Sequence, residues 1–273
     1  MTKSFDVPPL AHPVVDTHCH MDVSYDDEQI LPDVGQALAN AASVGVTKVI
    51  QVGCDVTSSK WAAETASKFD DVFATVALHP NAAAHDPDLE SSLAQIDQLA
   101  ALPQVRGLGE TGLDYYRTDK EKAQAQHISF RAHIDMAIKH NKPVIIHDRD
   151  AHDDVIDTLL NYKCPETVVF HCYSGDEAMA KICAKHGWYM SFAGTVTFKN
   201  ATNLHAAVKV VPDELLLVET DSPFLTPTPY RGQPNTSAHV ALTVREISRL
   251  RGQSEEDICK LVFSNAARVF GPF

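Results

Sequence analysis

The stretch Pro13-Val14-Val15-Asp16-Thr17-His18-Cys19-His20 decides between the folds that this chain could adopt. Its apolar start predicts a β-strand, and the alternation of side chains along a strand puts Asp16, His18 and His20 on one face. A doubly wound, nucleotide-binding sheet would place a glycine-rich turn directly after this first strand. The strand ends in two histidines instead, which argues against the open sheet and predicts no nucleotide cofactor.

Short β-branched apolar runs alternate with helical patterns along the rest of the chain. Eight runs are predicted as strands: 14–20, 47–52, 72–78, 105–110, 143–147, 167–171, 188–192 and 215–221. Helical periodicity covers 30–44, 62–69, 89–102, 124–140, 155–162 and 176–186, and two further helical patterns lie within 238–270. This alternation is typical of βαβ units, and eight such units fit an α/β protein of the (β/α)8 TIM-barrel type. We therefore predict a single barrel domain over residues 1–273.

The composition is that of an ordinary globular protein, with 44% apolar and 22% charged residues. No apolar run approaches the length needed to span a bilayer. Residues 1–11 are polar and then proline-containing, without the apolar segment of a secretory signal. A cytoplasmic protein without a membrane partner is the expectation that follows by elimination.

Charge and cysteine usage narrow the possible partners and the redox compartment. The formal net charge of −13 argues against a broad basic surface that coats nucleic acid. A local phosphate site remains possible, because bound cations can supply the positive charge there. The six cysteines form no C-x-x-C pair and are expected to stay free thiols, with Cys19 and Cys172 as small buried residues within strands.

Residues of the types that bind metals end most of the predicted strands. Catalytic groups of a barrel come from the carboxyl ends of its strands, so these side chains are expected to converge. They are His18, His20, His79, Glu110, His147, His171, Glu219 and Asp221. Four of the histidines and two of the carboxylates are about the supply that two adjacent divalent cations need. The histidines away from strand ends are expected to face solvent.

Two further carboxylates, Asp16 and Glu219, each lie two residues before a candidate ligand on the same strand face. We predict that they lie one layer deeper and accept the second N–H of a metal-bound imidazole. The alternative is structural hydrogen bonding inside the barrel. Asp114, four residues after Glu110, is either a loop ligand or a loop anchor.

The motifs at the strand ends resemble, in order, those of the TatD deoxyribonucleases, metal-dependent hydrolases of the amidohydrolase-like barrel superfamily. The resemblance extends over residues 14–270 and rests on Asp16-Thr17-His18-Cys19-His20, Leu78-His79-Pro80, Gly109-Glu110-Thr111-Gly112-Leu113-Asp114, His147-Asp148-Arg149, His171-Cys172-Tyr173-Ser174-Gly175 and Glu219-Thr220-Asp221-Ser222-Pro223. One departure concerns the segment after Arg231-Gly232, where the family usually has an Asn-Glu-Pro-like run. This chain has Gln233-Pro234-Asn235-Thr236-Ser237, without the acidic residue, which affects expected substrate contacts rather than metal ligands.

The resemblance implies a role for each candidate ligand. One cation would bind to His18, His20 and Asp221, and the second to His147 and His171, with Glu110 between them. The cations would be Mg²⁺, Mn²⁺ or Zn²⁺. The implied activity is hydrolysis of DNA phosphodiester bonds from a 3′ end, on single strands or strand ends. A water activated by the two cations would attack phosphorus, and Asp221 would accept its proton.

The predicted substrate contacts are His79, Arg149, Tyr173 and Arg231. Arg149 would hold a phosphate oxygen, or else pair with Asp148 or Asp150 at the surface. Tyr173 and the pair Tyr115-Tyr116 would stack on an exposed base, and Lys199 is a further phosphate contact. Two alternatives stay open: hydrolysis of a small ester, amide or aminoacyl substrate, and a non-catalytic metal-binding scaffold.

Overall fold

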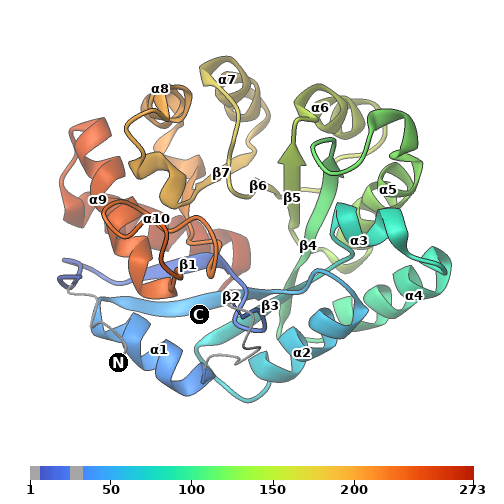
Figure 1. The fold of residues 1–273 in the computed structure, drawn as a ribbon, viewed down its shortest axis with the longest axis horizontal. Helices are drawn as coiled ribbons and strands as arrows, with labels where there is room; N and C mark the ends of the chain where they lie inside the picture. The colour runs from blue at the N-terminus through green and yellow to red at the C-terminus, as the bar shows by residue number, and fades with distance from the viewer. Residues whose placement is uncertain (1–6, 25–32) are drawn as a thin grey trace.

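The chain forms a barrel of eight parallel strands in the order β1 to β8 (Figure 1). The computed structural model describes residues 7–24 and 33–273. The strands are β1 (Val14–Cys19), β2 (Val46–Val52), β3 (Val72–Val76), β4 (Val105–Asp114), β5 (Val144–Arg149), β6 (Val168–Phe170), β7 (Tyr189–Phe192) and β8 (Leu216–Val218). Backbone hydrogen bonds from His20 N to Ser222 O, 2.7 Å, and from Asp221 N to His18 O, 2.9 Å, join the end of β1 to the chain after β8. The predicted (β/α)8 TIM barrel is confirmed.

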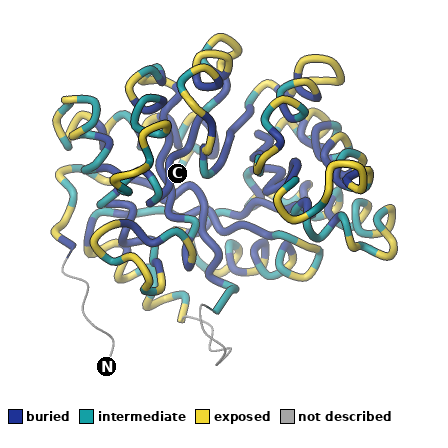
Figure 2. Tube along the Cα trace, turned by 45° about the horizontal axis from the view of Figure 1, so that its top comes forward, coloured by how far each residue is buried: buried dark blue, intermediate teal, exposed yellow. Residues whose placement is uncertain are grey.

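Helices surround the strands on the outside. They are α1 (Val34–Ser43), α2 (Val56–Ala66), α3 (Pro80–His85), α4 (Leu89–Ala100), α5 (Gln124–His140), α6 (His152–Asn161), α7 (Glu177–His186), α8 (Thr202–Val210), α9 (Val240–Arg251) and α10 (Glu255–Phe270). Short 3-10 turns cover Lys120–Lys122, Gly194–Thr197, Asp213–Leu215 and Ser237–His239. Figure 2 shows buried residues at the centre of the molecule, and exposed residues on the outer helices. None of the helices among the described residues is long and apolar enough to cross a membrane.

Helix boundaries differ from the sequence pattern where capping side chains set them. The predicted helix over 30–44 begins at Val34, after the N-cap Asp33, and its residues 30–32 lie outside the described part of the chain. Helix α2 begins at Val56 rather than at residue 62, because Asp55 and Ser58 form a reciprocal capping box that fixes the earlier start. Helices α3 and α8 were not among the predicted helical segments.

The interior of the barrel is apolar at the end where most of these strands begin. Val15, Ile145, Val169 and Leu217 each occupy the second position of their strand and pack with Ile50 in one buried cluster. Ala266, Val269 and Phe270 of α10 join that cluster. Because the early strand positions are filled in this way, the polar residues that follow them are left at the carboxyl end of the barrel.

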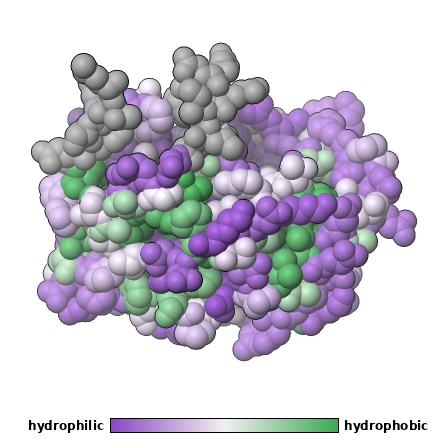
Figure 3. All heavy atoms as spheres, turned by 90° about the horizontal axis from the view of Figure 1, so that it is seen from below, coloured by the Kyte–Doolittle hydropathy of each residue, from purple (hydrophilic) through white to green (hydrophobic). Residues whose placement is uncertain are grey.

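Several sequence predictions about individual residues need correction. Cys172 lies after β6 rather than within a strand, with a φ of 41° and intermediate burial. Cys19 is buried in β1 as predicted, and all six cysteines are free thiols. His133 and His239 are fully buried instead of facing solvent, because each has a polar partner inside the protein: Leu78 N donates to His133 Nε2, and Asn235 Oδ1 lies 2.9 Å from His239 Nδ1. On the face of the molecule that Figure 3 shows, hydrophilic and hydrophobic side chains lie interspersed.

Candidate metal centre

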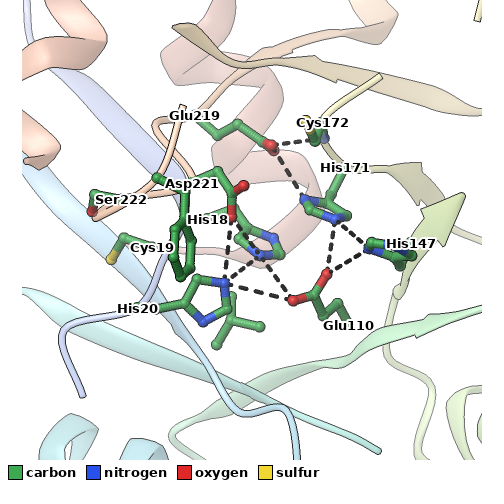
Figure 4. A network of polar contacts seen from close by, with 12 residues as sticks. His18, Cys19, His20, Glu110, His147, His171, Cys172, Glu219, Asp221 and Ser222 are labelled. Atoms are coloured by element: carbon green, nitrogen blue, oxygen red, sulfur yellow. Dashed lines mark hydrogen bonds and ion pairs between the residues drawn. The ribbon is translucent and has the colours of Figure 1, made fainter. Parts of the chain in front are cut away.

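Six of the predicted ligands meet at the carboxyl end of the barrel (Figure 4). They lie within β1, β4 and β5, directly after β1 and β6, and in the chain just after β8: His18, Glu110, His147, His20, His171 and Asp221. Asp221 has a φ of 54°, which turns the chain out of β8 and lets its carboxylate face the histidines of β1. Groups of three within this set have ligand atoms less than 4.8 Å apart, which is close enough to surround a metal ion.

Glu110 lies between two sets of imidazoles. Its Oε1 is 3.6 Å from His20 Nε2 and 3.8 Å from His18 Nε2. Its Oε2 is 2.8 Å from His171 Nε2 and 3.1 Å from His147 Nδ1. His79 Nε2 also lies 3.8 Å from Oε2. Each carboxylate oxygen therefore faces its own set of histidines, which is the arrangement that a carboxylate shared by two cations requires.

Asp221 completes the side of the cluster that β1 contributes. Its Oδ1 lies 3.4 Å from His20 Nε2 and 3.8 Å from His18 Nε2. His171 reaches the same side, because its ring stacks on that of His18 with centroids 3.9 Å apart, and His18, His171 and Asp221 form one possible metal-holding group. The two donor sets overlap, so the division of ligands between two cations stays a prediction.

The donor atoms fit divalent cations. His18 Nε2 and His20 Nε2 lie 3.2 Å apart, although only one proton fits between two such nitrogens. Burial would raise the pKa of Glu110, but the neighbouring His171 and His79 and a hydrogen bond from His147 hold this pKa well below its usual range. Burial would lower the pKa of His171, but the Glu110 and Glu219 carboxylates raise it well above its usual value. The cluster therefore favours positive charge at its centre, and imidazole with carboxylate suits Zn²⁺, Mn²⁺ and Mg²⁺.

Glu219 and Asp16, the two carboxylates predicted to lie one layer deeper, have different hydrogen-bond partners. Glu219 Oε1 lies 3.3 Å from His171 Nδ1 and accepts a hydrogen bond from Cys172 N, so it has the predicted contact with an imidazole. Asp16 accepts hydrogen bonds from the backbone N and hydroxyl of Thr220 and from His18 N. The predicted contact of Asp16 with a ligand imidazole is wrong, because the chain leaving β8 presents Thr220 to it. Asp16 has the alternative structural role and joins β1 to that chain.

Asp114 anchors its loop and also orients a ligand. Strand β4 extends to Asp114, beyond the predicted end at residue 110, and this places its Oδ2 3.3 Å from His147 Nε2. Asp114 Oδ1 accepts a hydrogen bond from Arg117 N at 2.8 Å. Burial alone would raise the pKa of Asp114, but the hydrogen bonds with His147 and Arg117 lower it to about 2. An ionised Asp114 keeps the proton of His147 on Nε2, which leaves the Nδ1 lone pair directed at the cluster.

Replacing Asp114 with Ala is therefore expected to weaken cation binding and to lower turnover roughly 10- to 100-fold, the usual effect of losing a carboxylate that orients a metal-binding imidazole. Asp114→Asn, which retains one acceptor oxygen, should lose less. Isothermal titration with Mn²⁺ measures the affinity. Asp119→Ala is the matched control, because Asp119 is exposed and pairs only with Lys122 among the described residues. Unchanged Mn²⁺ affinity in Asp114→Ala would contradict the assignment.

Two more residues lie at the edge of the cluster. His79 Nε2 is 3.3 Å from His147 Nδ1, and His79, Asp114 and His147 form a further possible metal-holding group. Burial lowers the pKa of His79 to about 4, so the ring is neutral. Cys54, which the sequence analysis missed, donates from Sγ to Glu110 Oε1 at 3.4 Å, and burial raises its pKa to about 12. A single cysteine in a loop carries no sequence signal for such a contact.

Of the predicted substrate contacts, Tyr173 is buried in the core, whereas Arg149 and Arg231 are exposed. Tyr173 is 2% exposed, donates its hydroxyl to Asp176 O and packs on Phe192, so the prediction that it stacks on a base is wrong: the ring is part of the core. Arg149 is exposed, with its guanidinium 3.8 Å from the centre of the Tyr116 ring, while Asp148 contacts His152 instead.

Arg231 is exposed and lies 4.0 Å above the ring of Phe198, and Lys199 is exposed as well. Contacts of DNA with His79, Arg149 and Arg231 stay predictions.

An eight-stranded parallel barrel with this cluster of imidazoles and carboxylates at its carboxyl end defines a metal-dependent hydrolase. The family model described as "TatD related DNase" matches residues 15–271. The chain belongs to the TatD family. It is 39% identical to the uncharacterized metal-dependent hydrolase TatD of Mycobacterium tuberculosis, over 94% of this chain and 98% of that protein. It is 37% identical to the uncharacterized metal-dependent hydrolase YabD of Bacillus subtilis, over 93% and 98%.

Solved structures share the fold of this chain. The TatD homologue YjjV of Escherichia coli superposes with a TM-score of 0.87 at 27% identity, over 95% of this chain and 98% of that one. A TatD-family hydrolase of Entamoeba histolytica, at 20% identity, shares the fold with a TM-score of 0.82 over 97% and 100% of the two chains.

Proposed function

We propose that this chain is a two-metal deoxyribonuclease that removes nucleotides from the 3′ end of a DNA strand. The observation that carries the proposal is the placement of Glu110, whose two oxygens face separate sets of imidazoles. The description of the matching family model supports DNA as the substrate. The direction of digestion rests on the family resemblance.

In this proposal His18, His20 and Asp221 would hold one cation, His147 and His171 would hold the second, and Glu110 would contribute an oxygen to each. Bound divalent cations would supply the nucleophile by acidifying water and would neutralise charge on the phosphoryl oxygens. Glu219 and Asp114 keep protons on His171 Nδ1 and His147 Nε2, so that the opposite nitrogens of these rings face the centre.

Asp221 is the proton acceptor in the proposal. Burial would raise the pKa of Asp221, but the hydrogen bond with His20 and the nearby His18 lower it, so its carboxylate is ionised at neutral pH. It is also the more exposed of the two carboxylates at the centre, with 15% of its side chain accessible against 6% for Glu110. A carboxylate at the mouth of the site can accept a proton and release it to solvent.

The DNA must approach an acidic protein, which favours capture of an end over coating of a duplex. The net charge of −13 repels a polyanion, and the cation pair would offset this locally. Arg149 and Arg231, both exposed, are the proposed phosphate contacts at the rim.

Protein stripped of metal is expected to leave a single-stranded oligonucleotide intact, and added Mg²⁺ or Mn²⁺ should restore digestion. A 3′ label should be released as mononucleotide, while a 5′-labelled strand should shorten stepwise. The same metal-loaded protein is tested on an ester and an aminoacyl substrate. Intact DNA together with cleavage of either small substrate would contradict the nuclease and support the alternative hydrolase. If metal-loaded protein hydrolyses neither DNA nor either small substrate, the result would favour the non-catalytic scaffold.

A further inference from the structure

Phe224 is an exposed aromatic ring at the mouth of the metal centre. It is 45% exposed, whereas His20, with which it makes an edge contact at 6.3 Å between ring centroids, is 5% exposed. Most large apolar side chains of the described chain are buried, and an apolar ring beside a cluster of ionisable groups is not needed to hold cations. Its position next to a candidate ligand instead suits a flat apolar part of the substrate.

The backbone that carries Phe224 is fixed to the backbone that carries Asp221. Phe224 N donates to Asp221 O at 2.9 Å. The side chain of Asn235, itself 5% exposed, donates from Nδ2 to Thr220 O at 2.9 Å and to Phe224 O at 2.6 Å. The backbone of Phe224 is therefore held in a set place relative to the cluster, and its ring has an edge contact with that of His20. A side chain on an ordered backbone binds a planar partner at a lower cost in entropy than one on a loose loop.

The side of the barrel rim opposite β1 carries a cationic side chain rather than an apolar ring. Strand β5 is separated from β1 by three strands in either direction around the barrel. Its last residue, Arg149, has its guanidinium carbon 3.8 Å from the centre of the Tyr116 ring, and Tyr116 is 62% exposed. One side of the mouth therefore presents an apolar ring and the other a cationic guanidinium, which suits a substrate with a planar base at one end and phosphate at the other.

We propose that Phe224 is the stacking platform for the 3′-terminal nucleobase of a single DNA strand. This inference rests on the proposed function and extends it to substrate selection. The scissile phosphate lies at the cations, the terminal base stacks on Phe224, and the next phosphates run toward Arg149. Stacking requires only the flat face that every base has, so the platform selects for the presence of a base and tolerates any sequence.

The test compares two 3′-labelled single strands that differ only in their terminal nucleotide, a thymidine or an abasic tetrahydrofuran residue. The ratio of the two kcat/KM values, base over abasic, is the readout. Wild-type protein should favour the base-bearing strand by roughly 5- to 150-fold, the range expected for stacking of one base on an aromatic ring. The ratio should fall toward one in Phe224→Ala and in Phe224→Leu, which keeps apolar volume without a flat face, and Phe224→Tyr should keep it.

Ile138→Ala is the control for loss of an exposed apolar side chain, since Ile138 is 47% exposed on α5, and it should leave the ratio at the wild-type value. Mn²⁺ titration of each variant verifies that the centre is intact. If all the proteins hydrolyse both strands and the ratio in the Phe224 variants equals that of the wild type, the stacking platform is overturned and the proposed function is not. Failure of metal-loaded wild-type protein to cleave either strand would overturn the proposed function and the platform with it.

Discussion

Glu110→Gln is expected to bind at most one cation, where two are proposed for the wild-type chain, and to lose roughly 10²–10³-fold in turnover. The side chain keeps its size, but one of its two oxygens becomes an amide that donates hydrogen bonds. That amide would face either His18 and His20 or His147 and His171, since the two oxygens of Glu110 divide between these pairs. A group that donates cannot bind a cation, so one of the two positions is lost.

Metal analysis after equilibrium dialysis against Mn²⁺ measures the stoichiometry, and release of labelled mononucleotide measures turnover. Glu166→Gln is the matched control, because Glu166 is an exposed glutamate on the loop before β6. Thermal unfolding of both variants without metal tests whether the barrel is intact. Two equivalents of Mn²⁺ bound to Glu110→Gln with wild-type affinity would show that this carboxylate does not bridge.

The sequence predicted the ligand cluster well for a specific reason. Each of the six residues ends an apolar run, and the ends of parallel strands in a barrel meet at one rim. Their convergence therefore follows from the strand count, without knowledge of any loop. The same reasoning predicted that Glu219 contacts a ligand imidazole, because alternation along the strand puts it on the inner face one layer deeper. In the structure this imidazole is that of His171.

The residues that the sequence placed wrongly depend on loops and on packing between elements. Tyr173 comes two residues after the candidate ligand His171, yet its ring is in the core because the chain turns at Cys172 with a positive φ. Cys54 reaches Glu110 from the loop after β2, and no periodicity governs that loop. Asn235 fixes the segment after β8 by two side-chain hydrogen bonds to residues 11 and 15 positions earlier, a contact that only the folded chain reveals.

Asp221→Asn is expected to keep both cations and to lose roughly 10²–10⁴-fold in turnover, the usual contribution of a positioned acid–base group. Asparagine retains a carbonyl oxygen that can face His18 and His20 as Asp221 Oδ1 does, at 3.8 and 3.4 Å. It cannot accept a proton at neutral pH. Loss of turnover without loss of cations is therefore the signature of a proton acceptor, whereas a residue that only binds metal would lose both together.

The pH dependence of turnover further distinguishes a proton acceptor from a residue that only binds metal. In the wild-type chain burial would raise the pKa of Asp221, but the hydrogen bond with His20 and the nearby His18 lower it. Activity should therefore persist to acidic pH until this carboxylate is protonated, as long as the cations stay bound. In Asp221→Asn the remaining activity should rise with the concentration of hydroxide, because no side chain then accepts the proton. Asp70→Asn, at an exposed position on the loop before β3, is the matched control. A variant that loses a cation in proportion to its turnover would make Asp221 a ligand alone and would leave the proton to pass directly to solvent.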